Sequence, residues 1–163
     1  MKRSAGLLVW RRGAGSGEEA RPDGVEVLLA HPGGPLFARK DDGHWSIPKG
    51  ELDDGEEPLA AANREFAEEI GVAPPPSDPV PLGEAAQRGG KVNIVWAVEG
   101  DLDVTQVQSN LFPLEWPPHS GRIQEFPEID RAEWFPVERA REKVFASQQI
   151  FLDRLLAAID DRS

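Results

Sequence analysis

The chain contains no cysteine and no tyrosine. The absence of cysteine excludes disulfides, thiolate nucleophiles and zinc–sulfur sites. It suits a reducing compartment, and we expect a cytoplasmic protein. The sequence also lacks any apolar run that approaches the ~20 residues needed to span a membrane, so no membrane partner is expected.

Basic residues are scarce relative to acidic ones. The chain has 18 lysines and arginines against 29 aspartates and glutamates, which gives a formal net charge of −11. This charge repels a phosphate backbone, so non-specific nucleic-acid binding is not expected. A small phosphorylated ligand remains compatible, because a bound divalent cation inverts the local sign of the charge.

The length of 163 residues predicts a single domain over residues 1–163. Short apolar runs at Ala5–Arg12 and Val25–His31 predict two strands of a hairpin, joined by the glycine-rich segment Gly13–Gly24. Further strands are predicted at His44–Lys49, Val80–Ala86, Lys91–Glu99 and Ala132–Phe135.

Helical patterns occupy two parts of the chain. Residues Glu56–Gly71 predict one clear helix, and Val137–Ile159 predict one helix or two that pack on the sheet. The stretch Thr105–Pro127 shows no clear period, which indicates a long irregular loop. Strands mixed with two helical regions predict an α/β layered domain.

Carboxylates gather on one face of the helix that follows Gly50. At 100° per residue, Glu69 lies about 40° from Glu65, and Glu68 lies about 60° away on the other side. Like charges at these spacings destabilise a helix, and the negative end of the helix dipole adds to the penalty. A cation would relieve both effects, and hard oxygen ligands suit Mg²⁺ or Mn²⁺. The alternative is a solvated acidic face.

The residues around this face are spaced as in a known family. Gly50, five residues, Glu56, seven residues and then Arg64–Val72 (REFAEEIGV) agree with the Nudix box at seven fixed and two apolar positions. The chain therefore resembles the Nudix hydrolases. The resemblance implies an α/β/α sandwich with a mixed β-sheet, in which the box folds as loop–helix–loop. It also implies metal-assisted attack of water on a diphosphate linked to another group.

The resemblance also implies a ligand set for the metal. Glu65, Glu68 and Glu69 would bind Mg²⁺ or Mn²⁺, and the carbonyl of Gly50 would complete the shell. Glu56 would be a secondary or water-mediated ligand. These five residues form the predicted metal site.

Arg64 and one glutamate complete the predicted catalytic set. Arg64 is expected to orient the carboxylates through charge-assisted hydrogen bonds. The general base varies within the family: it is either a glutamate of the box, such as Glu65, or one from a later loop. Glu125 and Glu128 are the candidates for that distant base, and the alternative for each is a solvated loop carboxylate.

The substrate is less clearly indicated. Lys49, beside Gly50, is a candidate contact for a substrate phosphate, and Trp116 is the candidate aromatic for stacking a nucleobase. The region 87–89 (QRG) carries no proline or tyrosine marker of the ADP-ribose or dinucleoside polyphosphate subgroups. The run from Trp45 to Gly50 resembles enzymes that act on nucleoside triphosphates, dinucleoside polyphosphates or diphosphoinositols.

We therefore predict a metal-dependent Nudix pyrophosphohydrolase that cleaves a pyrophosphate bond in a small nucleoside diphosphate-linked molecule. One alternative is a Nudix-fold module that binds a nucleotide without cleaving it; such modules usually lose box carboxylates, whereas this chain retains all four. The other alternative is an acidic domain whose glutamate-rich helix serves a protein partner. That interpretation predicts no tight binding of divalent metal.

Overall fold

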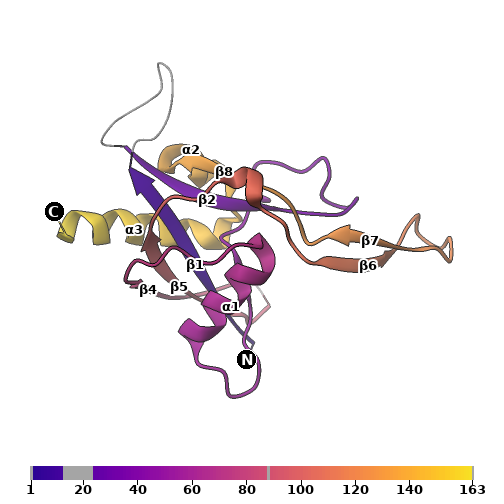
Figure 1. Ribbon diagram of the computed structural model, residues 1–163, viewed down its shortest axis with the longest axis horizontal. Helices are drawn as coiled ribbons and strands as arrows, with labels where there is room; N and C mark the ends of the chain where they lie inside the picture. Colours follow the sequence, from indigo (N-terminus) through magenta and orange to yellow (C-terminus); the bar gives the residue numbers. More distant parts are fainter. Residues whose placement is uncertain (1, 13–23, 88, 163) are drawn as a thin grey trace.

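The computed structural model describes residues 2–12, 24–87 and 89–162. Its centre is a six-stranded sheet in the order β4–β5–β1–β2–β8, with β3 paired to β1 outside this path (Figure 1). β1 and β5 are parallel and the other neighbours are antiparallel, so the sheet is mixed. The strands of this sheet are β1 (Arg3–Arg12), β2 (Val25–Pro32), β3 (Lys49–Glu51), β4 (Val80–Ala86), β5 (Val92–Glu99) and β8 (Ile129–Pro136).

Helices cover both faces of the sheet. α1 (Pro58–Ile70) packs on one face, and α2 (Val137–Lys143) and α3 (Gln149–Arg162) pack on the other (Figure 1). Two short 3₁₀ turns, η1 (Val104–Gln106) and η2 (Ala146–Gln148), complete the helical elements. The predicted α/β/α sandwich is thereby confirmed. In the ranges that the structure describes, none of the helices has the length and apolar character needed to cross a membrane.

β1 runs through the centre of the sheet and is buried on both faces. Leu8 and Trp10 contribute to the core under α2 and α3, whereas Leu7 and Val9 contribute to the core under α1. Because side chains alternate along a strand, the apolar run of β1 contributes side chains to the cores on both faces of the sheet. The predicted hairpin of β1 and β2 is confirmed, and the connecting residues 13–23 lie outside the described part of the chain.

α1 begins and ends close to where the sequence predicts. Pro58 occupies the first turn, where its missing N–H loses no hydrogen bond, and Gly71 ends the helix with a φ of 81°. Ala62, Phe66 and Ile70 are fully buried against the sheet. This packing fixes the rotation of the helix and turns its acidic face away from the core.

The strand predicted at His44–Lys49 is wrong. Trp45 and Ser46 form only isolated bridges, and the regular strand begins at Lys49 instead. Pro48 carries no N–H for a ladder, so the pairing is interrupted just before the residues that resemble the box.

The stretch predicted to be irregular, Thr105–Pro127, contains a hairpin. β6 (Leu111–Glu115) and β7 (Ile123–Pro127) pair antiparallel as a separate two-stranded sheet that projects from the rest of the molecule (Figure 1). Phe112 and Phe126 are paired across it, with ring centroids 6.2 Å apart. Prolines obscure this hairpin in the sequence, but they are tolerated because both of its strands are edge strands.

Candidate functional site

The acidic face of α1 reaches the backbone of β3 at Gly50. A Cβ atom on Gly50 would stand 2.0 Å from Oε2 and 2.7 Å from Cγ of Glu65. Only glycine leaves room for the Glu65 carboxylate in this position. The fold therefore brings the Gly50 backbone and Glu65 together, as the resemblance to the Nudix box implies.

The guanidinium of Arg64 donates hydrogen bonds to three carboxylates of this segment. It donates to Glu56 from Nε and from Nη2, both at 2.8 Å, and from Nη1 to Glu65 at 2.9 Å and to Glu68 at 3.1 Å. The hydrogen bonds from Arg64 lower the pKa of Glu56 from 4.5 to about 2, and the hydrogen bonds to Glu56 and Glu65 raise the pKa of Arg64. These contacts agree with the orienting role expected for Arg64.

Glu69 is the glutamate of this face whose pKa is raised most strongly. Burial, reinforced by the negative charge of Glu65, raises the pKa of Glu69 from 4.5 to about 8. The backbone N–H of Lys49 donates to Glu69 Oε2 at 3.1 Å and acts in the opposite direction. Ionisation of this buried carboxylate is costly, and a bound cation would stabilise its ionised form.

The carboxylates surround a guanidinium and are not arranged as a ready metal-ligand set. Burial also raises the pKa of Glu65, although its hydrogen bond from Arg64 opposes this effect, and Glu68 is exposed. Across the residues that the structure describes, no three His, Asp or Glu side chains are grouped closely enough to hold a metal ion as they stand. In this structure Glu65 and Glu68 are instead hydrogen-bonded to Arg64.

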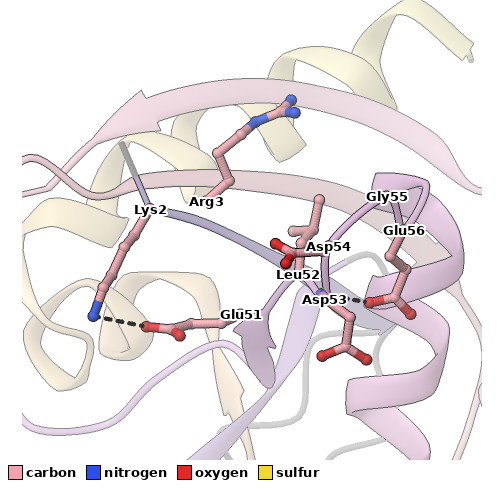
Figure 2. Close-up of a pocket in the computed structure, with 8 residues that line it drawn as sticks. All are labelled: Lys2, Arg3, Glu51, Leu52, Asp53, Asp54, Gly55 and Glu56. Atoms are coloured by element: carbon pink, nitrogen blue, oxygen red, sulfur yellow. Dashed lines mark hydrogen bonds and ion pairs between the residues drawn. The ribbon is translucent and has the colours of Figure 1, made fainter.

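A cavity of about 490 Å³ adjoins the loop between β3 and α1. Figure 2 shows Lys2 and Arg3, at the start of β1, on one side of it and the loop residues 52–56 on the other, with Glu51 at the end of β3 extending towards Lys2. Lys2 Nζ lies 3.9 Å from Glu51 Oε1. We did not predict these two cations as site residues, because a basic pair near the start of a chain belongs to no motif.

Comparison with known proteins identifies the family. The family model for the NUDIX domain matches residues 20–155. The chain belongs to the Nudix family. The carboxylate-bearing segment Gly50–Val72 is therefore a Nudix box, and Nudix proteins generally use divalent metal ions.

Curated Nudix relatives are phosphohydrolases by name. The chain is 46% identical over 71 residues to an 8-oxo-(d)GTP phosphatase of Mycolicibacterium smegmatis, a match that covers 42% of this chain and 20% of that protein. It is 26% identical over 127 residues to an RNA pyrophosphohydrolase of Agrobacterium fabrum, covering 69% of each protein. The first match thus spans about a fifth of the relative's length. These names agree with the prediction of a Nudix pyrophosphohydrolase.

Solved structures show the same fold. A C. elegans Ap4A hydrolase in a binary complex superposes with a TM-score of 0.65 and 23% identity, covering 99% of both chains. At this identity the likeness concerns the fold, and it extends over the whole of the present chain.

Of the two candidate distant bases, Glu128 is the one whose charge acts on the Nudix box. The negative charge of Glu128 contributes to the raised pKa of both Glu65 and Glu69. Glu125 lies on β7 opposite Pro113, within the projecting hairpin (Figure 1). The sequence cannot separate two glutamates three positions apart, because their distance from the box depends on how the chain turns after β7.

The two predicted substrate contacts lie in different surroundings. Lys49 adjoins the box, and burial lowers the pKa of its side chain while the charge of Glu69 opposes that shift. Trp116 directly follows β6 in the projecting hairpin, where its backbone N–H donates to the Arg122 carbonyl at 2.9 Å. Contact with a substrate stays a prediction for both residues.

Proposed function

We propose that this Nudix protein is a metal-dependent hydrolase that cleaves a pyrophosphate bond in a small nucleoside diphosphate-linked substrate, such as a nucleoside triphosphate or a dinucleoside polyphosphate. The observation that carries the proposal is the convergence of the box glutamates on Arg64 and on the backbone of Gly50. The nucleotide class is supported by the names of the relatives.

The residues of the box fit Mg²⁺ or Mn²⁺. The carbonyl of Gly50 and the carboxylates of Glu56, Glu65, Glu68 and Glu69 are hard oxygen donors, which such ions prefer. The raised pKa of Glu69 supports this assignment, because burial makes the ionised carboxylate costly and a bound cation would offset that cost. When bound, these ions would neutralise the diphosphate and acidify a bound water.

We assign Glu128 as the general base. Its carboxylate would take the proton of the attacking water while the bond between phosphorus and the leaving phosphate breaks. Its charge already acts on Glu65 and Glu69, whereas Glu65 itself is occupied by a hydrogen bond from Arg64. Glu125 remains the alternative base.

Two cationic side chains serve binding and placement in this proposal. Arg64 would keep Glu56 in place through its paired hydrogen bonds. Lys49 would contact a substrate phosphate, because a partly desolvated ammonium gains from an anionic partner.

The net charge and the length of the chain bear on the kind of substrate and on the number of domains. The net charge of −11 supports a small-molecule substrate, because sequence-independent binding of a nucleic acid is disfavoured. We treat residues 1–163 as one catalytic domain that acts in the cytoplasm.

The test is a panel of nucleoside triphosphates, dinucleoside polyphosphates and nucleotide sugars, incubated with Mg²⁺, with Mn²⁺ or with chelator. We expect release of phosphate, pyrophosphate or a nucleoside monophosphate that depends on metal. Glu69→Gln should lower kcat by about 100-fold. Glu57→Gln is the matched control, because Glu57 is exposed and its side chain does not cap α1, and it should retain activity. Tight nucleotide binding without turnover would favour the non-catalytic module instead.

A further inference from the structure

A histidine that the sequence does not single out is fully buried beside the segment that bears Glu128. His31, near the end of β2, has an exposed fraction of 0%. Its Nε2 lies 2.6 Å from the carbonyl oxygen of Lys40, and its Nδ1 lies 2.8 Å from Oδ1 of Asp130. The ring therefore joins three separate parts of the chain: β2, the loop that follows it, and the start of β8.

Both ring nitrogens of His31 have a partner. A carbonyl oxygen can only accept a hydrogen bond, so Nε2 donates to Lys40, and Nδ1 is bonded to the carboxyl group of Asp130. A buried polar ring is costly to leave without partners, so both bonds stabilise the position of His31.

Asp130 reaches His31 because β8 is irregular at this point. His31 stands opposite Arg131 and Pro32 stands opposite Ile129, which leaves Asp130 as an extra residue without a partner on β2. Such a bulge re-aims side chains and bends the strand. The hydrogen bond with His31 therefore holds the bulge in one conformation.

The residues just before the bulge are also held by hydrogen bonds. The backbone N–H of Glu128 donates to the Asn110 carbonyl at 2.8 Å, and the N–H of Gly33 donates to the Glu128 carbonyl at 2.8 Å. The N–H of Ile129 donates to Ser109 Oγ at 2.9 Å. The backbone of Glu128 is thus fixed on both sides, and the bond between Asp130 and His31 anchors the residues that follow it.

We propose that His31 and Asp130 are positioning residues, whose buried hydrogen bond fixes the bulge beside Glu128 and so determines where this proposed base lies. This inference rests on the proposed function for its effect on catalysis. It does not rest on that function for the placement of Glu128, which can be measured separately.

Two variants break the pair with different severity. Asp130→Ala is the milder one, because the side chain of Asp130 is 34% exposed and leaves no large void. His31→Gln is harsher, because one amide nitrogen cannot replace both ring donors in a buried position. Asp101→Ala is the matched control: it removes an exposed aspartate that accepts a hydrogen bond from Arg11, away from the box.

The first readout is amide hydrogen exchange, which needs no substrate. We expect Asp130→Ala to speed exchange of residues 127–131 by about tenfold or more while exchange in α1 stays unchanged. Asp101→Ala should leave residues 127–131 unchanged. Unaltered exchange of residues 127–131 in Asp130→Ala would overturn the proposal, whether or not His31→Gln folds.

The second readout is kinetic and separates positioning from a general loss of structure. We expect Asp130→Ala to lower kcat by about tenfold with little change in KM, and to cause no further loss in a Glu128→Gln background. Losses that multiply in the double variant would contradict the proposal. If the wild-type chain hydrolyses no member of the panel, the proposed function fails, and hydrogen exchange still decides whether the pair fixes this segment.

Discussion

At the scale of single residues, the missing side chain of Gly50 determines where the Glu65 carboxylate can lie. The atoms that a Cβ would meet at Gly50 belong to the flexible side chain of Glu65 and not to backbone. A larger residue can therefore be accommodated, but only if the carboxylate moves. A substitution of Gly50 should therefore disturb the position of Glu65 more than it disturbs the stability of the fold.

We predict that Gly50→Ala retains the fold and loses activity. Displacement of Glu65 by an ångström or more should lower kcat by about 100-fold, whereas the free energy of unfolding should change by less than about 1 kcal/mol. Steady-state kinetics and urea denaturation measure the two effects. Full activity in a folded Gly50→Ala variant would show that the position of Glu65 is not critical.

The raised pKa of Glu69 predicts how the stability of the metal-free protein depends on pH. An unfolded glutamate loses its proton near its ordinary pKa of 4.5, whereas the folded protein keeps the proton on Glu69 until about 8. Between these values the folded state binds more protons, so this group lowers the free energy of unfolding as pH rises through the window. Urea denaturation in the presence of chelator measures the slope.

Glu69→Gln is the control for this dependence. Glutamine does not titrate, so the contribution of Glu69 to the slope between pH 4.5 and about 8 should disappear. An identical pH profile in the wild type and in Glu69→Gln would mean that Glu69 does not retain a proton in this range.

Spacing along the chain was enough to predict that Glu65 and Glu68 lie together on α1, because helical geometry fixes the neighbours of Glu65. The partner that holds them in the absence of metal was also expected, since Arg64 belongs to the same box. The placement of Glu128 could not be predicted in the same way. Its backbone lies beside the bulge at Asp130 and is bonded to Asn110 and Gly33, and no local sequence pattern reveals this pairing.

At the scale of elements, the end of α1 depends on a glycine for two reasons. Gly71 has a φ of 81°, and a Cβ there would stand 2.1 Å from the backbone oxygen of Gln108. The neighbouring Gln108 N–H donates to the Ile70 carbonyl at 2.8 Å, so this close approach joins the helix end to the segment that leads into the hairpin.

We predict that Gly71→Ala lowers the free energy of unfolding by about 2–3 kcal/mol, because it adds a backbone clash to the strain of a positive φ. Gly55→Ala is the matched control. Gly55 has a φ of 75°, but a Cβ added there would meet no atom of the described residues within 4 Å, so only the strain of about 1 kcal/mol should be measured. Chemical denaturation measures both variants. Equal losses would mean that the contact with Gln108 contributes nothing.

The elements also differ in how far the sequence predicts them. α1 carries a proline at its start, a glycine at its end and a buried stripe between them, so its bounds follow from local chemistry. The strands β6 and β7 were missed, because Pro113 and the Pro117–Pro118 pair resemble loop signals. A hairpin in which both strands are edge strands tolerates such residues. The sequence alone does not reveal that β6 and β7 are edge strands.

At the scale of the whole molecule, the projecting hairpin is separable from the central sheet. Pro113 and Glu125 are paired across it, so an Asn-Gly turn can replace residues 114–124 and close the two strands. We predict that this shortened chain folds and keeps kcat, because the hairpin forms a sheet of its own. Circular dichroism and the substrate panel test this. A large rise in KM would support the predicted contact of Trp116 with substrate.

The hydrogen bonds of Arg64 have a consequence for the life of the protein before it meets a metal. The guanidinium already offsets the mutual repulsion of Glu56, Glu65 and Glu68 through its hydrogen bonds. If the protein is the metal-dependent hydrolase proposed above, metal starvation would therefore silence it while leaving this part of the fold intact. Activity could return as soon as supply is restored, without fresh synthesis.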